Sequence, residues 1–68
     1  MPAVVSSAIR SVDYDAESET LFVRFTSGKR YAYLDVPAAV YEAFLAAESK
    51  GGFFADEIRG AYEFHRAR

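Results

Sequence analysis

Apolar and polar side chains alternate most clearly over residues 20–26. Leu21, Val23 and Phe25 fall on one face of an extended chain there. Phe22 and Arg24 fall on the other face. A period of two predicts a β-strand that buries one of its faces.

A less regular strand is predicted just before it, over residues 9–15. Ile9 and Val12 are three positions apart, which breaks strict alternation. A β-bulge between them would let both side chains face the core.

A tight turn and a third strand, over residues 29–35, are predicted next. A three-residue loop over residues 26–28 would place Gly28 in the left-handed conformation that glycine adopts readily. The apolar alternation on both sides of the turn predicts an antiparallel hairpin.

The length of this loop also predicts the pairing of the two strands. Val23 would lie opposite Tyr31, and Leu21 would lie opposite Tyr33. Both tyrosines would then share the apolar face of the hairpin, whereas a slip of one residue would move them to the other face.

A helix is predicted to begin at or near Pro37, whose fixed φ suits the first helical position. Its larger apolar side chains recur at spacings of three and four residues and would face the sheet: Val40, Tyr41, Phe44 and Leu45. The pair Gly51-Gly52 is predicted to end this helix.

A short second helix is predicted over residues 53–59, because Phe54 and Ile58 are four positions apart. Tyr62 and Phe64 then alternate, as in an extended tail that docks on the sheet or the helices. The predicted fold class is α+β: a three-stranded antiparallel sheet packed by two helices, in the order β-β-β-α-α, with a short extended C-terminal tail.

Length and composition fit one small domain over residues 1–68. Apolar residues make up 51% of the chain, and five Tyr and six Phe supply much of the core volume. With no cysteine and one histidine, His65, no disulfide, metal or cofactor is expected. No apolar run approaches the ~20 residues of a membrane span, and no signal peptide is recognised, so we expect a soluble, cytoplasmic protein that does not contact membranes.

The charge balance argues against broad nucleic-acid affinity. Eight Lys and Arg against ten Asp and Glu give a net charge of -2. A strongly basic footprint is therefore missing, although local basic patches remain available, as around Arg24, Lys29 and Arg30.

Spaced motifs cover nearly the whole chain: Ser6-Ser7-Ala8-Ile9, Leu21-Phe22-Val23-Arg24-Phe25, Tyr31-Ala32-Tyr33, Val36-Pro37, Val40-Tyr41, Glu48-Ser49-Lys50-Gly51 and Ile58-Arg59-Gly60. In this combination they resemble the KTSC domain, which occurs at the C-terminus of some lysyl-tRNA synthetases and as standalone bacterial and phage proteins. The resemblance implies RNA binding, because of the synthetase context. The chain departs from the family pattern at Ala55, Asp56 and Glu57, where that pattern has asparagine followed by polar or basic residues.

The predicted hairpin holds the first candidate site. Tyr31 and Tyr33 could stack on bases, while Arg30, together with Arg24 and Lys29, meets phosphates. The alternative is that both tyrosines are core or rim residues whose rings pack on the helix and whose hydroxyls reach water.

The second candidate is the Ser-Lys-Gly-Gly segment over residues 49–52. Lys50 and Arg59 could hold a phosphate or a carboxylate beside a turn with free N–H groups. The alternative is a helix-ending turn in which Lys50 complements the helix C-terminus and Arg59 pairs with an acid. A third candidate is the aromatic and basic tail, which could clasp nucleic acid or a partner protein: Tyr62, Phe64, His65, Arg66 and Arg68.

Catalysis is not predicted, because no serine lies in a nucleophile motif and a single tail histidine is a poor triad base. The leading hypothesis is a non-catalytic module that binds RNA, such as tRNA, or another phosphate-bearing ligand weakly. Its predicted site residues are Tyr31, Tyr33, Lys50, Arg59 and Arg30. The alternative is a protein-interaction or self-association module, which the net charge favours and which an open sheet edge permits.

Overall fold

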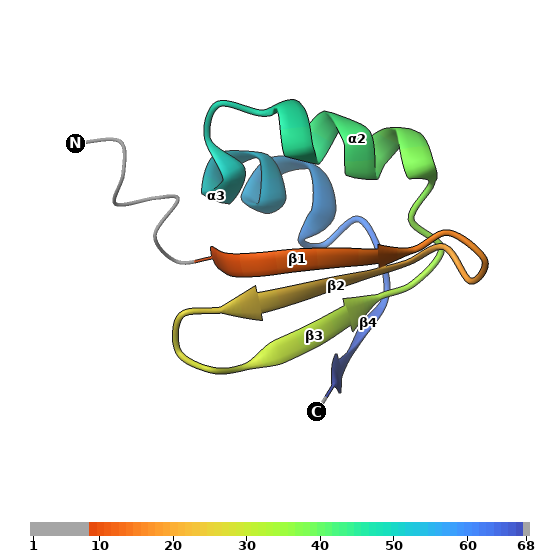
Figure 1. Cartoon of the computed structure of the whole chain (residues 1–68), viewed down its shortest axis with the longest axis horizontal. Coiled ribbons are helices and arrows are strands. Elements are labelled where there is room, and N and C mark those ends of the chain that lie inside the picture. The colour runs from red at the N-terminus through yellow and green to blue at the C-terminus, as the bar shows by residue number, and fades with distance from the viewer. Residues whose placement is uncertain (1–8, 68) are drawn as a thin grey trace.

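The computed structural model describes residues 9–67, so the motif residues Ser6, Ser7 and Ala8 and the tail residue Arg68 lie outside it. Within this range one antiparallel sheet, with the strand order β1-β2-β3-β4, carries helices on one of its faces (Figure 1). The elements in chain order are β1 (Ile9–Asp15), β2 (Thr20–Phe25), β3 (Arg30–Tyr33), α2 (Ala38–Ala46), α3 (Lys50–Phe53), the π-helical turn η1 (Phe54–Ile58) and β4 (Phe64–Ala67). The α+β class and the β-β-β-α-α order are confirmed.

The first strand contains the predicted bulge. The β1–β2 pairing shifts register between Ile9 and Ser11. Ile9 and Val12 both pack against the core as a result. The broken alternation was therefore a correct signal of a bulge rather than evidence against a strand.

The second hairpin turns where the glycine predicts. Gly28 has a φ of +94°, and its N–H donates to the Phe25 carbonyl at 2.9 Å. Leu21 pairs with Tyr33 and Val23 with Tyr31, as predicted. Both tyrosines consequently lie on the side of the sheet that faces the helices.

The predicted number of strands is wrong, because the extended tail is itself a strand. In the described range the tail forms β4, which pairs with β3 so that Phe64 lies opposite Tyr33 and Arg66 opposite Tyr31. The Leu34 N–H also donates to the Glu63 carbonyl at 2.8 Å. Backbone pairing to the free edge of β3 thus extends the sheet, although three of the four β4 side chains are exposed.

The core lies between the sheet and the helices. Its fully buried side chains include Leu21 and Val23 from β2, Phe44 from α2 and Ile58 from η1. Burial of each such side chain contributes roughly 1.5–3 kcal/mol. These contacts hold α2 and η1 against the same face of the sheet.

An aromatic contact ties the outer strand to the first helix. The rings of Tyr14 and Tyr41 stack with centroids 4.8 Å apart. The Tyr14 hydroxyl donates to the Val36 carbonyl at 2.6 Å. This pair fixes the segment that leads from β3 into α2.

The predicted helix boundary at Gly51-Gly52 is wrong. The first helix ends at Ala46, and the second begins at Lys50, so both glycines lie inside the second helix. Ser49 is its N-cap, and its hydroxyl accepts the Gly52 N–H at 3.1 Å. A Cβ at Gly52 would lie 3.0 Å from the Ser49 Oγ. A serine cap with a glycine that leaves room for it thus outweighs the low helix propensity of glycine.

This cap gives a direct test. Ser49→Ala removes an acceptor from the first turn of α3, so the free energy of unfolding should fall by about 1 kcal/mol. Ser27→Ala, at an exposed hairpin position, is the control and should change it by less than about 0.5 kcal/mol. Urea denaturation of the three proteins measures both values; equal stability of Ser49→Ala and the parent would show that the cap does not stabilise the helix.

Candidate functional site

Three of the five predicted site residues come together in one groove. The groove has a volume of about 300 Å³ and lies where β3, β4 and η1 meet. Its lining residues are Phe25, Tyr31, Tyr33, Phe54, Arg59 and Phe64. We call this surface the aromatic groove.

The five rings of the aromatic groove form a closed circuit of contacts. Phe64 contacts Tyr31 and Tyr33, with ring centroids 5.6 and 5.2 Å apart. On the opposite side, Phe54 contacts Tyr33 and Phe25, each at 5.4 Å, and Phe25 closes the circuit to Tyr31 at 5.8 Å. Four of these five contacts are edge-to-face, a favourable geometry that holds each ring in place.

Exposure differs sharply among the rings. Tyr33 is 4% exposed and Phe54 is 7% exposed, so both are core residues. Tyr31 and Phe25 are half-buried. Phe64 is 55% exposed. The packing alternative therefore describes Tyr33, and Phe64 is the most exposed of the five aromatic residues.

Two cations accompany the rings. Burial raises the pKa of Tyr33 above its ordinary value, Tyr31 raises it further, and the positive charge of Arg59 opposes both. The Arg59 guanidinium is thus close enough to act on the Tyr33 hydroxyl. Arg66 lies opposite Tyr31 on β4 and is exposed. Because residues opposite one another share a face of the sheet, Arg66 adds a second cation next to the aromatic groove.

Lys50 does not join this site. Its Nζ donates to the Ala47 carbonyl at 2.7 Å, at the C-terminal end of α2. This is the predicted alternative, in which the lysine complements a helix C-terminus. Lys50 is also the first residue of α3. In the first turn of that helix the Gly52 N–H donates to the Ser49 hydroxyl, so this segment begins a helix.

Arg30 lies on the other face of the sheet. It pairs with Arg24 across the hairpin, on the side away from the core. Its guanidinium carbon lies 4.8 Å from the centre of the Phe22 ring, a cation–π contact. The five predicted residues are therefore divided among three places in the fold.

Phe64 and Arg66 were predicted only within the separate tail candidate, and the structure brings them beside the tyrosines. The alternation of Tyr62 with Phe64 signalled an extended tail, but the strand Phe64–Ala67 carries one large apolar side chain. So short and polar a segment gives no indication of its partner strand. Only the pairing with β3 brings Phe64 onto the tyrosines.

Across residues 9–67, no group of three or more His, Asp or Glu side chains could hold a metal ion. None of the helices in that range is long and apolar enough to cross a membrane.

Comparison with known proteins identifies relatives over most of the chain. The KTSC domain matches residues 5–62. A protein from Tsukamurella paurometabola is 47% identical over 53 residues, which cover 78% of this chain and 79% of that protein. A lysine–tRNA ligase from Nostoc punctiforme is 37% identical over 60 residues, which cover 88% of this chain but 11% of the ligase. The crystal structure of a KTSC domain protein from Yersinia pestis superposes with a TM-score of 0.89 at 35% identity, covering 93% of this chain and 89% of that one.

The burial of Tyr33 predicts a loss of stability at high pH. Its pKa is raised on folding, so its stabilising contribution is complete below the unfolded pKa of about 10 and is lost as the pH rises through the folded value. Tyr33→Phe removes this group, and its free energy of unfolding should fall less between about pH 9 and about pH 11 than that of the parent. Denaturant unfolding across that range measures the difference; identical pH profiles would mean that Tyr33 ionises equally in both states.

Proposed function

The chain belongs to the KTSC domain family, as its motifs predicted, and from this membership and the aromatic groove we propose that it is a non-catalytic module that binds single-stranded RNA weakly. The observation that carries the proposal is the exposed ring of Phe64, fixed by Tyr31 and Tyr33 and accompanied by Arg59 and Arg66. The KTSC matches indicate no catalytic family for the chain.

An exposed, fixed aromatic ring suits an unpaired base. Stacking on an aromatic side chain is worth roughly 1–3 kcal/mol per base and tolerates any base. Phe64 is held from below by the two tyrosines, so binding would cost little ordering of the ring. A base within a duplex keeps its faces covered by its neighbours, which is why we propose a single-stranded segment.

The cations supply the second part of the interaction. Arg59 and Arg66 are both exposed and would meet phosphates on either side of a stacked base. The net charge of -2 supplies no long-range attraction, so the affinity depends on these few local contacts and is weak.

The relatives supply the biological context. A segment equivalent to 88% of this chain forms 11% of a lysine–tRNA ligase, an enzyme whose name gives tRNA as what it acts on. A domain that adds an RNA contact to such an enzyme would also work as a small separate protein. This context supports RNA over other phosphate-bearing ligands.

The second candidate function is protein interaction or self-association. The observation that favours it is the position of β4 at the edge of the sheet, with Phe64 exposed on it. An edge strand can pair with a strand of a partner, and an exposed ring can anchor the contact. Such an apolar interface would respond little to salt, whereas RNA binding weakens steeply as salt rises.

Removal of the exposed ring tests the proposal. Phe64→Ala should weaken the binding of a short oligo-uridine RNA about fivefold to 150-fold, because one stacking contact is lost. Phe64→Leu keeps apolar volume against Tyr31 and Tyr33 but offers no flat ring, so it should also weaken binding. Fluorescence anisotropy with labelled RNA at low salt measures the affinities.

Leu45→Ala is the matched control, since Leu45 is 46% exposed on α2 away from the aromatic groove. It should bind RNA as the parent does, and circular dichroism should show all variants folded. Full affinity in Phe64→Ala would contradict the assigned site. Parent protein that binds no RNA but changes its mass with concentration in light scattering would favour self-association.

A further inference from the structure

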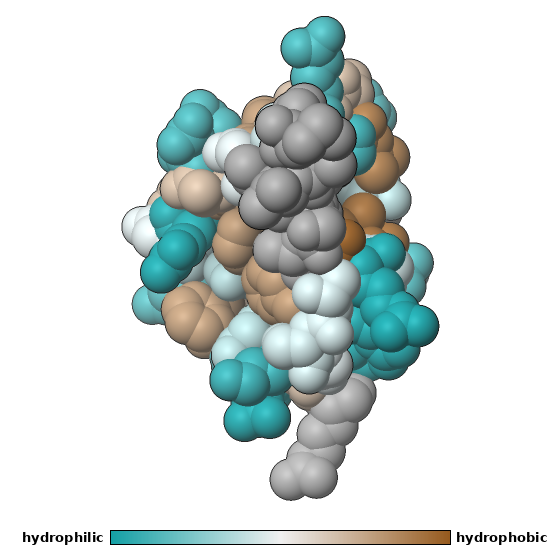
Figure 2. Space-filling view, turned by 90° about the vertical axis from the view of Figure 1, so that its left-hand side faces the viewer, coloured by the Kyte–Doolittle hydropathy of each residue, from teal (hydrophilic) through white to brown (hydrophobic). Residues whose placement is uncertain are grey.

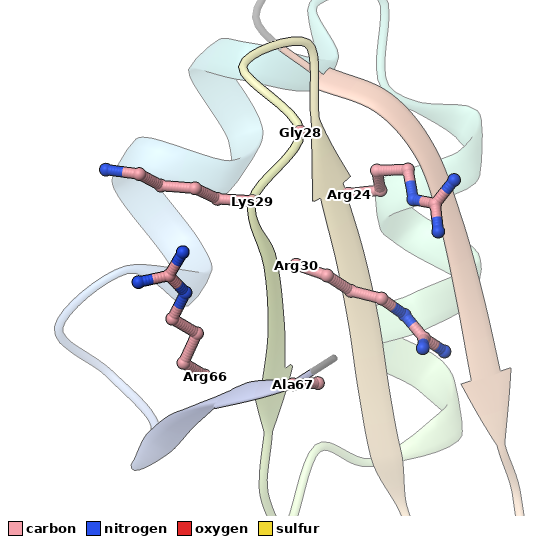
Figure 3. A pocket seen from close by; sticks show the side chains of 6 residues that line it. All are labelled: Arg24, Gly28, Lys29, Arg30, Arg66 and Ala67. Carbon is pink, nitrogen blue, oxygen red and sulfur yellow. The ribbon is translucent and has the colours of Figure 1, made fainter.

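A second surface, at the β2–β3 hairpin, gathers positive charge. Four of the chain's eight Lys and Arg residues line one depression of about 480 Å³, with a glycine and an alanine between them and no acidic residue in the lining. Its lining residues are Arg24, Gly28, Lys29, Arg30, Arg66 and Ala67 (Figure 3). We call it the basic depression. Figure 2, which views the hairpin end of the molecule, shows hydrophilic side chains along both sides of its lower part.

The four cations lie in two pairs. Arg30 extends across β2, and Arg24 extends from β2 in the same direction, whereas Lys29 and Arg66 extend to the opposite side of β3 (Figure 3). A compact ion would therefore not reach all four charges at once. An extended chain with repeated negative charges, crossing β3 near the hairpin turn, would meet one pair and then the other.

Arg24 and Arg30 place two positive charges side by side at the hairpin end. The two residues are direct partners on neighbouring strands. Like charges directly opposite one another destabilise a hairpin, so this pair favours nearby negative charge. Within the structure Arg30 is held by the Phe22 ring, and Asp13 lines an adjoining depression together with both arginines. Lys29 and Arg66 line only the basic depression, and its lining includes no acidic residue.

Arg66 joins the basic depression to the aromatic groove. It lines the depression, and its cross-strand partner Tyr31 lines the groove. A strand of RNA that leaves the groove beside Tyr31 therefore meets Arg66 first and Lys29 next. The two surfaces lie in series along one path around the edge of the sheet.

We propose that the basic depression carries the sugar–phosphate backbone of the bound single strand, leading from the aromatic groove past Arg66 and Lys29 to Arg24 and Arg30. The proposal rests on the RNA binding proposed above and adds the path and the number of phosphate contacts. It assigns base stacking and the Arg59 phosphate contact to the aromatic groove, and the further phosphate contacts to the hairpin end.

Two probes separate these roles. An abasic phosphodiester oligomer offers phosphates without bases, whereas oligo-uridine RNA of the same length offers both. In NMR titrations at low salt, the abasic oligomer should shift the resonances of Arg24, Lys29, Arg30 and Arg66 and leave Phe64 and Phe54 in place. The RNA should shift both sets, and added salt should reverse the shifts of the cations.

Single substitutions then count the contacts. For the RNA, the slope of log K against log salt should become shallower by about 0.7 in Arg24→Gln and again in Lys29→Gln, because each loses one phosphate contact. Arg10→Gln is the matched control: Arg10 is an exposed residue of β1 outside both surfaces, and its loss should leave the slope unchanged.

The outcomes separate the two proposals. RNA shifts confined to the aromatic groove, with equal slopes in Arg24→Gln, Lys29→Gln and the control, would overturn the backbone path and leave RNA binding standing. Shifts in the basic depression with both probes, without any in the groove, would support the phosphate path and overturn base stacking. If neither probe shifts any resonance at low salt, both proposals are overturned.

Discussion

The pairing of β4 with β3 is the interaction on which the candidate site depends. It brings residues more than thirty positions apart into register, with Phe64 opposite Tyr33 and Arg66 opposite Tyr31. Without it Tyr33 would lose one of its two ring neighbours, and the aromatic groove would lose its exposed ring. The strand holds little apolar area of its own, so backbone hydrogen bonds and the Phe64 contacts supply its attachment. The candidate site therefore depends on a short edge strand that is attached mainly through backbone pairing.

Local patterns predicted the first half of the fold well. Alternation and the break between Ile9 and Val12 predicted the first two strands and the bulge. The glycine at residue 28 predicted the register of the β2–β3 hairpin, because register follows from turn length and from which face is buried. The second half depended on weaker signals. A serine cap set the start of α3 despite two glycines, and the short β4 could be placed only through its partner. Both are decided by hydrogen bonds that composition and periodicity do not report.

The candidate site shows the same division. Tyr31, Tyr33 and Arg59 were predicted and do meet in one groove. Burial then separates their roles, because Tyr33 supports the groove from within whereas Phe64 presents its face to solvent. Lys50 contacts the C-terminal end of α2 and Arg30 lies on the outer face of the sheet, so neither lies in the aromatic groove with the tyrosines. Four of the eight Lys and Arg residues nevertheless line one depression at the hairpin end, although the chain has a net charge of -2.

The most direct test of base stacking on Phe64 is an intermolecular NOE experiment on the labelled protein with short oligo-uridine RNA. We expect NOEs between the uracil H5 and H6 protons and the Phe64 ring protons, in a complex that dissociates as salt is raised. A saturated complex without NOEs between the bases and the Phe64 ring would contradict base stacking on Phe64. NOEs only between two copies of the protein across β4 would contradict it as well.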